Sequence, residues 1–198
     1  MTSSTFFHEG QRELQDHFDS RRIADRLEEA RRHDDFSDHD RAIITTAPFF
    51  FIATITPDGH PDCSFKGGMP GFVRIIGNNV LAFPDYDGNG MFRTLGNIRR
   101  NPNVGLLFLQ FSENRFRIRI NGTATCHLSG PELETFEGAQ AVVHVTARDI
   151  FPNCPRYIPE MKLENQSEYS PRPNYEPPDP AWKSKPDLAP YLSPKKRK

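Results

Sequence analysis

Two segments of the sequence carry the residue types that hold a phosphate-like dianion. In a predicted strand, Ser64 supplies a hydroxyl donor and Lys66 a positive point charge. The segment 85–90 has two glycines and an asparagine directly before a predicted helix, so several backbone N–H groups can point at one spot. The helix N-terminus adds partial positive charge there. Together the segments predict an anion-binding site, although Lys66 at a strand end also fits an ordinary solvated lysine.

The cysteines and histidines form no recognisable catalytic or metal-binding pattern. Cys63, Cys126 and Cys154 are widely separated and include no Cys-x-x-Cys pair, which favours reduced thiols buried as small hydrophobic residues. None of the seven histidines belongs to a His-x-x-x-His or a His-Glu-x-x-His motif. We therefore predict no metal site and assign no catalytic residue.

Short apolar and β-branched runs predict the strands that position these residues. The segment 49–67 is typical of a β-hairpin around the turn Pro57-Asp58-Gly59. Further strands are predicted at 72–76, 80–83, 104–111, 116–120 and 141–145, and one helix at 91–100. Prolines 152 and 155 are expected to keep 151–158 irregular. This pattern favours a mainly β fold with flanking helices, a small antiparallel barrel of five or six strands.

The chain is expected to divide into three parts. Residues 1–47 are predicted to be a helical segment packed on the barrel, and residues 48–162 to be the barrel domain itself. Eight of the 18 prolines lie beyond residue 163, among polar residues. Such a composition buries too little apolar surface to offset its ordering entropy, so 163–198 is predicted to be an extended or disordered tail.

Two kinds of helical signal occur in the N-terminal part. Between Glu9 and Arg32, sparse apolar residues recur at four-residue spacing among charges, which predicts amphipathic helices covering the barrel or a partner subunit. Ser37 followed by Asp40 resembles a capping box and predicts a helix over 38–46.

Composition excludes several classes of function. The formal net charge is −1 with 26% charged residues, so no overall field favours nucleic acid or an anionic membrane. The longest apolar stretches are too short to span a bilayer, and the N-terminus resembles no secretory leader, so a cytoplasmic location is expected. The basic end 194–198 resembles a nuclear-import signal but also fits simple solubilising charge.

An ordered set of short motifs resembles the pyridoxamine 5′-phosphate oxidase-like, FMN-binding split-barrel superfamily over about residues 10–162. The segment 149–158 resembles the end of the domain in one bacterial branch of that superfamily. The matching segments are Ala53-Thr54-Ile55, 63–68, 81–90, Gly96-Asn97-Ile98, 101–107 and Asn121-Gly122-Thr123-Ala124.

The resemblance implies a fold, a cofactor and an activity. It implies a six-stranded antiparallel split β-barrel of the FMN-binding type, with FMN held between the subunits of a homodimer. The flavin would then transfer hydride or electrons to or from a small organic substrate, so no acid–base dyad is required. The candidate cofactor-binding residues are Ser64, Lys66, Gly67, Asp87, Gly88, Asn89, Met91, Arg93, Arg117 and Arg156.

One departure from the family pattern leaves the cofactor open. Many members carry a basic pair at the start of the helix, where this chain has Asn89-Gly90-Met91 with Arg93 as the nearest cation. The cofactor alternatives are the deazaflavin F420 and haem. The alternative function is a non-catalytic binding module for a flavin, F420 or haem, serving storage or sensing.

Two strand patterns bear on assembly. The strand 104–109 is apolar on both faces, which predicts that a second subunit buries one of them. The strand 116–120 alternates, so that Arg117 and Arg119 share one face. These arginines face either solvent or an anion across the subunit interface.

Overall fold

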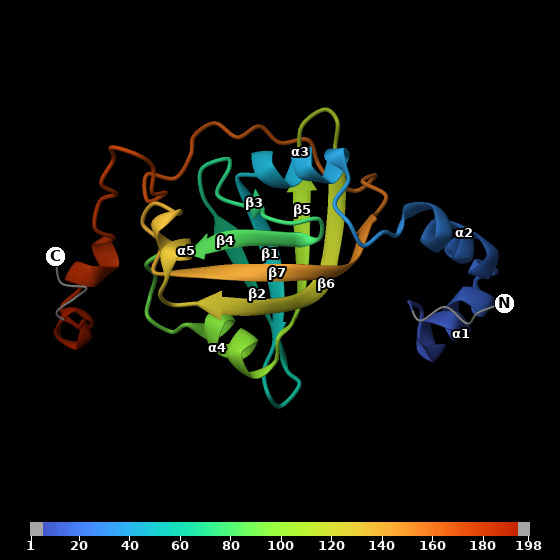
Figure 1. Cartoon of the computed structure of the whole chain (residues 1–198), viewed down its shortest axis with the longest axis horizontal. Coiled ribbons are helices and arrows are strands. Elements are labelled where there is room, and N and C mark those ends of the chain that lie inside the picture. Colours follow the sequence, from blue (N-terminus) through green and yellow to red (C-terminus); the bar gives the residue numbers. More distant parts are fainter. Residues whose placement is uncertain (1–5, 194–198) are drawn as a thin grey trace.

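A seven-stranded antiparallel sheet forms the body of the protein (Figure 1), in a computed structural model that describes residues 6–193. The order of strands across the sheet is β2-β1-β5-β6-β7-β4-β3. The strands are β1 (Phe49–Ile55), β2 (Pro61–Gly67), β3 (Arg74–Ile75), β4 (Val80–Asp85), β5 (Asn103–Gln110), β6 (Phe116–His127) and β7 (Ala141–Pro152). The predicted hairpin is confirmed, while the prediction of six strands in a mainly β protein is corrected to seven strands with substantial helix.

β6 and β7 are much longer than their apolar runs predicted. Each has 12 residues, and the two pair along almost their whole length, with a bulge between Asn121 and Gly122. The prediction that 151–158 is entirely irregular is wrong at its start, because Phe151 and Pro152 still pair with β6. A proline fits there since it ends the strand, where its missing N–H costs no further ladder bond.

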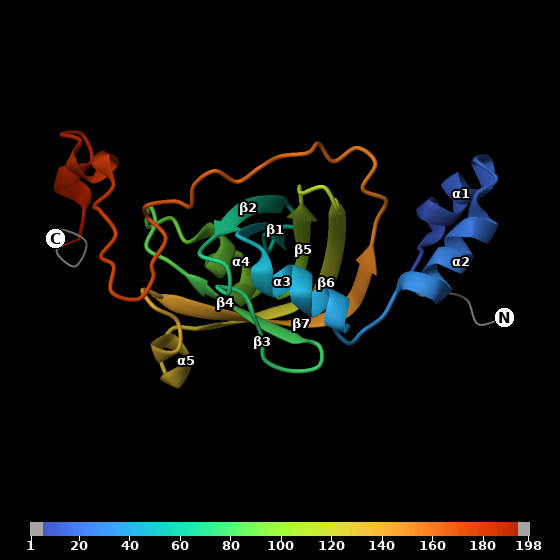
Figure 2. The same cartoon turned by 90° about the horizontal axis from the view of Figure 1, so that it is seen from above.

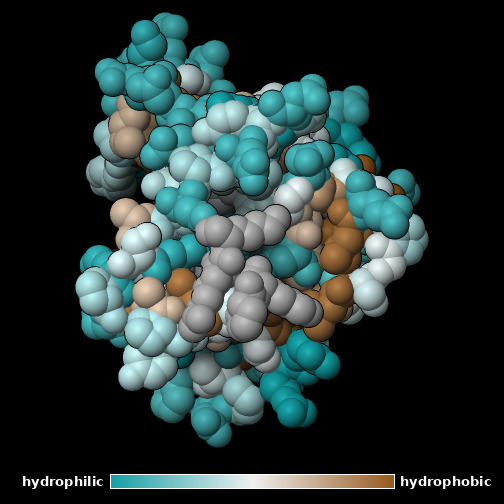
Figure 3. All heavy atoms as spheres, turned by 90° about the vertical axis from the view of Figure 1, so that its left-hand side faces the viewer, coloured by the Kyte–Doolittle hydropathy of each residue, from teal (hydrophilic) through white to brown (hydrophobic). Residues whose placement is uncertain are grey.

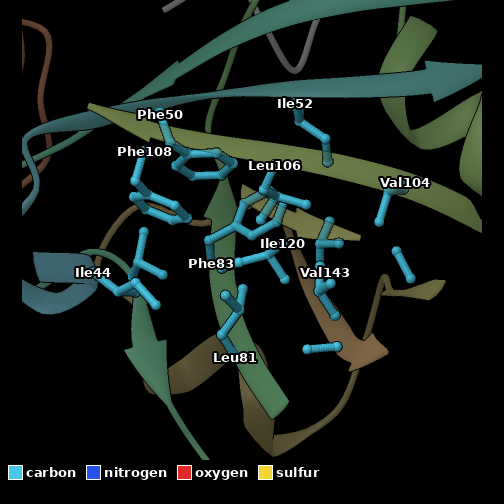
Figure 4. Packing of buried hydrophobic residues seen from close by; sticks show 14 of the residues in the cluster. Ile44, Phe50, Ile52, Leu81, Phe83, Val104, Leu106, Phe108, Ile120 and Val143 are labelled. Carbon is cyan, nitrogen blue, oxygen red and sulfur yellow. The ribbon is translucent and has the colours of Figure 1, made fainter. Parts of the chain in front are cut away.

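The sheet curls until its two ends face each other across one hydrophobic core. The ring of Phe50 on β1 lies 5.0 Å from that of Phe83 on β4 and 4.9 Å from that of Phe108 on β5. Figure 4 shows these side chains converging with Leu81 of β4 and Ile120 of β6. The inward residues of each strand are buried and the outward ones are more exposed, as period-two alternation requires.

α3 (Asp38–Thr46) packs across one end of the sheet, where Ile43 and Ile44 are buried. Its predicted capping box is confirmed: the Asp40 backbone N–H donates to Ser37 Oγ at 3.2 Å, and the Ser37 N–H donates to Asp40 Oδ2 at 2.9 Å. At the opposite end lies α4 (Arg93–Arg100), and the short α5 (Pro131–Glu134) lies at the side of the sheet, as Figure 1 shows.

α1 (Glu9–His17) and α2 (Arg21–Arg31) project beyond the end of β7 instead of covering the sheet (Figure 2). The backbone of His33 pairs with that of Ile150 through two hydrogen bonds of 3.0 and 2.8 Å. The Arg32 guanidinium forms an ion pair with Asp149 Oδ1 at 2.6 Å. These contacts fix the direction of the helices. Their apolar side chains remain more than half exposed: Leu14, Phe18, Ile23 and Leu27.

The described part of the C-terminal segment has little regular secondary structure. It runs along the outside of the sheet and ends in two short 3₁₀ turns, η1 (Ala181–Ser184) and η2 (Ala189–Tyr191), on the side of the molecule away from α1 and α2 (Figures 1 and 2). The basic stretch 194–198 lies outside the described residues. Within residues 6–193, no helix has the length and apolar character needed to cross a bilayer.

Candidate functional site

The two predicted anion-binding segments meet at one cavity of 240 Å³. β2 forms one side, and the loop after β4 together with the start of α4 forms the other. Six of the ten predicted cofactor residues line it: Ser64, Lys66, Gly88, Asn89, Met91 and Arg93. Its remaining lining residues are Asp85, Tyr86, Gly90, Phe92, Thr94, Leu95 and Gln140.

Strand alternation decides which β2 side chains face the cavity. Ser64 and Lys66 share the cavity face with Asp62, while Cys63 and Phe65 point outward. Cys63 is therefore exposed, and the expectation of a buried thiol is wrong there, as it is for exposed Cys154. The cavity face of β2 is thus wholly polar.

Hydrogen bonds join β2 to the first turn of α4. Thr94 Oγ1 donates to Ser64 Oγ at 3.0 Å, and Arg93 Nε donates to Asp62 Oδ1 at 3.1 Å. One turn further along, the buried Asn97 amide donates to Thr54 on β1 at 2.9 Å. These hydrogen bonds hold the N-terminus of α4 beside Asp62 and Ser64 of β2.

The loop before α4 takes backbone conformations that its composition permits. Gly90 has φ +81°, a region that glycine enters without steric cost. Phe92 has φ +49° immediately before the helix. The Met91 N–H donates to Asn89 Oδ1 at 2.9 Å, which holds the turn closed. Residues of this loop and of the first helical turn line the cavity, and the first N–H groups of a helix have no acceptor within the helix.

Carboxylates balance the cations of the site. Lys66 Nζ lies 3.2 Å from Asp85 Oδ1, whose other oxygen accepts from the Gln140 amide at 3.0 Å. From the C-terminal segment, Lys183 Nζ lies 3.0 Å from Asp87 Oδ2, and this hydrogen bond raises the pKa of Lys183. An anion entering the cavity must therefore share these cations with the carboxylates.

Cys126, whose Sγ lies 4.0 Å from the carbonyl oxygen of the lining residue Leu95, is unsuited to nucleophilic chemistry. Burial raises the pKa of Cys126 to about 11, and the charge of Asp85 adds to the rise. The thiol therefore stays protonated near neutral pH. Within residues 6–193, no three metal-binding side chains lie close enough to hold a metal ion.

The other four predicted residues lie outside the cavity lining. Gly67 ends β2 opposite Phe49, and Asp87 is in the loop but is engaged with the C-terminal segment. Arg156 donates to Cys154 Sγ at 3.3 Å. Arg117 lies near the opposite end of β6 from Cys126. Its Nε is buried and finds no hydrogen-bond partner among the described residues.

Sequence reasoning missed Thr94, Gln140 and Lys183. Thr94 follows the helix start by one residue and could have been found by extending the loop motif. Gln140 precedes β7 and Lys183 lies in the proline-rich segment. Neither has a local signal, because only the packing of distant segments brings it to the loop.

A second, larger cavity of 860 Å³ lies at the α3 end of the sheet. We call it the α3 groove. Its lining is mostly apolar and includes Ile43, Phe49, Phe111, Phe116 and Met161, with Arg115 and Lys162 among its polar residues. None of the ten predicted cofactor residues lines it.

The donors around the smaller cavity are of the kinds that bind phosphate in proteins. They comprise a lysine, two hydroxyls and the backbone N–H groups of a glycine-containing loop and the helix start that follows it. The volume of 240 Å³ is below the 300–1,000 Å³ typical of sites for whole drug-sized ligands.

Comparison with solved structures supports the fold assignment. The chain is similar to HupZ of Group A Streptococcus, with 18% identity and a TM-score of 0.50 over 64% of this chain and 99% of that one. An FMN-binding protein from Syntrophomonas wolfei shows 11% identity and a TM-score of 0.43 over 74% and 98% of the two chains. HutZ, a heme storage protein from Vibrio cholerae, shows 13% and 0.43 over 57% and 91%.

At 18% identity, the similarity to HupZ speaks only for the fold. No curated protein matches the sequence. Residues 36–163 match the family described as pyridoxamine 5′-phosphate oxidase, and this stretch is more than half of the chain and includes every strand of the sheet. The chain therefore belongs to the pyridoxamine 5′-phosphate oxidase-like family of FMN-binding split-barrel proteins.

Proposed function

We propose that this protein binds FMN and works as a flavin-dependent oxidoreductase on a small organic substrate. The observation that carries the proposal is the convergence of Ser64, Lys66 and the glycine-containing loop on one cavity at the start of α4. A flavin bound there supplies the hydride chemistry. The chain's own residues hold the phosphate, fix the position of the cofactor and exclude water from it.

Lys66 is the main charged donor in this proposal. Its side chain is 18% exposed, so its charge acts through partly desolvated surroundings. Ser64 and Thr94 contribute hydroxyls that already bond to each other at 3.0 Å. The first turn of α4 adds backbone N–H groups and the helix dipole.

We further propose that the protein is a homodimer and that the partner covers the outer face of β1, β2 and β5. Four phenylalanine rings lie there with centroids between 5.2 and 6.0 Å apart. We call them the outer aromatic patch: Phe49, Phe51, Phe65 and Phe111. Phe51 stands directly between Phe65 and Leu107 in the strand register, and Phe65 is 60% exposed. Exposed apolar surface of this kind marks interaction sites.

Arg117 supports a site shared between subunits. Arg117 pairs in register with Leu109 on β5, and Leu109 lies two residues before Phe111 of the outer aromatic patch. A buried guanidinium N–H without an acceptor is costly, so an anionic or carbonyl acceptor from outside the single chain would stabilise it. A second subunit or the cofactor it holds would supply that acceptor.

One observation favours the alternative, a binding module for storage or sensing of a flavin, F420 or haem. The charged side chains that line the cavity are held in ion pairs: Lys66 with Asp85, and Arg93 with Asp62. Tyr86 also lines the cavity, but burial raises the pKa of its phenol, so the cavity offers no charged acid or base that is free of an ion pair. Hydride transfer at a flavin needs none, so the two functions differ in reactivity and not in binding residues.

The absorption spectrum of the purified protein with FMN separates the two functions. A flavin spectrum that NAD(P)H bleaches under anaerobic conditions, and that an oxidised organic acceptor restores, supports the oxidoreductase. A bound flavin inert to these reagents supports the binding module. A protein that binds neither FMN nor riboflavin refutes both flavin functions.

A further inference from the structure

The C-terminal segment reaches the loop that forms the candidate phosphate site. Lys183 lies in η1, 93 positions after the end of that loop at Gly90, and its Nζ is 3.0 Å from Asp87 Oδ2 and 3.2 Å from Asp179 Oδ1. The Lys183 side chain is only 13% exposed. A lysine that buries its stem in this way gives up much of its freedom, so its charge is held in one place.

Several contacts place this segment against the body of the protein. Ser170 is buried, and Pro171 lies beside Gly138, which precedes Gln140 by two residues. Gln140 in turn donates to the Tyr86 carbonyl at 2.8 Å. The end of the molecule that carries the segment is otherwise mainly hydrophilic, with its hydrophobic residues confined to smaller areas (Figure 3). The contact that joins the segment to the loop is the ion pair between Lys183 and Asp87.

Negative charge lies close to the proposed phosphate position, and the contacts of Lys66 and Lys183 compensate it. Two carboxylates, Asp85 at the end of β4 and Asp87 in the loop itself, lie beside the place proposed for a phosphate dianion. Like charges repel over about 8–10 Å at ordinary ionic strength, so each unpaired carboxylate would weaken phosphate binding. Lys66 compensates Asp85, and Lys183 compensates Asp87.

We propose that Lys183 is a positioning residue of the phosphate site. It neutralises Asp87 and holds the loop, so that the loop accepts a phosphate-bearing flavin. The inference rests on the proposed FMN site and adds the C-terminal segment to it. Lys183 acts through Asp87 and contacts no reacting atom.

The test is a double-mutant cycle on the full-length chain, read by quenching of flavin fluorescence. The variants are Lys183→Met, Lys183→Arg, Asp87→Asn and the double variant Lys183→Met/Asp87→Asn. Each is titrated with FMN and with riboflavin, which lacks the phosphate. A repulsion across a partly exposed loop predicts that Lys183→Met weakens FMN binding roughly three- to tenfold.

The proposal predicts four further results. Riboflavin binding by Lys183→Met is unchanged, Lys183→Arg binds FMN like the wild type, Asp87→Asn binds FMN at least as well as the wild type, and the double variant recovers most of the lost affinity. Equal weakening of FMN and riboflavin, or no rescue by Asp87→Asn, overturns the role of Lys183. A wild type that binds neither flavin overturns the FMN site itself, which is a separate result.

Discussion

Replacing Lys66 by methionine removes the main charge of the proposed phosphate site while keeping most of the side-chain volume. A hydrogen bond to a charged group is worth about 1.5–3 kcal/mol. The variant also leaves Asp85 with Gln140 as its remaining polar partner, so an uncompensated carboxylate then faces the phosphate. FMN binding should therefore weaken by roughly tenfold to a hundredfold.

Riboflavin separates the loss of a phosphate contact from general damage to the fold. Titration of Lys66→Met with riboflavin should give an affinity close to that of the wild type, because the missing contact involves only the phosphate. Lys66→Arg keeps the charge and should retain most of the FMN affinity. Lys162→Met is the matched control, since Lys162 lines the α3 groove and not the phosphate cavity.

Equal losses of FMN and riboflavin affinity in Lys66→Met would refute the reasoning. Lys66 would then serve mainly to hold Asp85 and the loop in place. The thermal midpoint of each variant without ligand shows independently whether the Lys66–Asp85 pair stabilises the fold.

Three further changes have expected results. Phe65→Ala in the outer aromatic patch should weaken a homodimer roughly a hundredfold, since a half-exposed ring is lost from both copies, as light scattering against concentration would show. Gly122→Ala should destabilise the protein by about 3 kcal/mol in urea unfolding, because the added Cβ would lie 2.0 Å from the backbone oxygen of Thr146. Burial, and then the charge of a neighbouring imidazole, lower the pKa of His144. The unfolded chain then binds the proton more readily, so stability falls as the pH drops through about 6.5, and His144→Gln should reduce that dependence.

Each of these predictions has a control and a contrary outcome. Leu128→Ala removes a similarly exposed residue outside the patch and should leave assembly unchanged; a wild-type monomer at micromolar concentration contradicts the dimer. Gly96→Ala adds a methyl group on α4 with no atom within 4 Å and should stabilise by about 0.5–1 kcal/mol. Similar unfolding midpoints for the two glycine variants would contradict the close approach of β6 to β7. An unchanged pH profile in His144→Gln would show that other groups dominate.

Local signals explain how much of the site could be predicted from the sequence. Alternation along β2 placed Ser64 and Lys66 on one face, and the glycines before α4 marked the loop that meets them. The Ser37 capping box likewise located α3. Each of these features is determined by residues within a few positions of one another, so its physical cause is visible in the sequence.

The remaining features depend on packing between distant segments. β6 and β7 extend beyond their apolar runs because each pairs with the other, which no single run reveals. Lys183 reaches Asp87 only because the proline-rich segment follows the body of the protein back to the loop. The projecting helices α1 and α2 have the apolar spacing of covering helices, but their direction is set by the contacts of Arg32 and residue 33 with β7.

The phosphate of FMN is proposed to bind between β2 and the start of α4. A crystal structure of the protein with FMN is the decisive measurement. We expect phosphate oxygens within hydrogen-bonding distance of Lys66 Nζ and of backbone N–H groups in the loop before α4. A flavin seated in the α3 groove, or a phosphate with no contact to Lys66 or that loop, would contradict it.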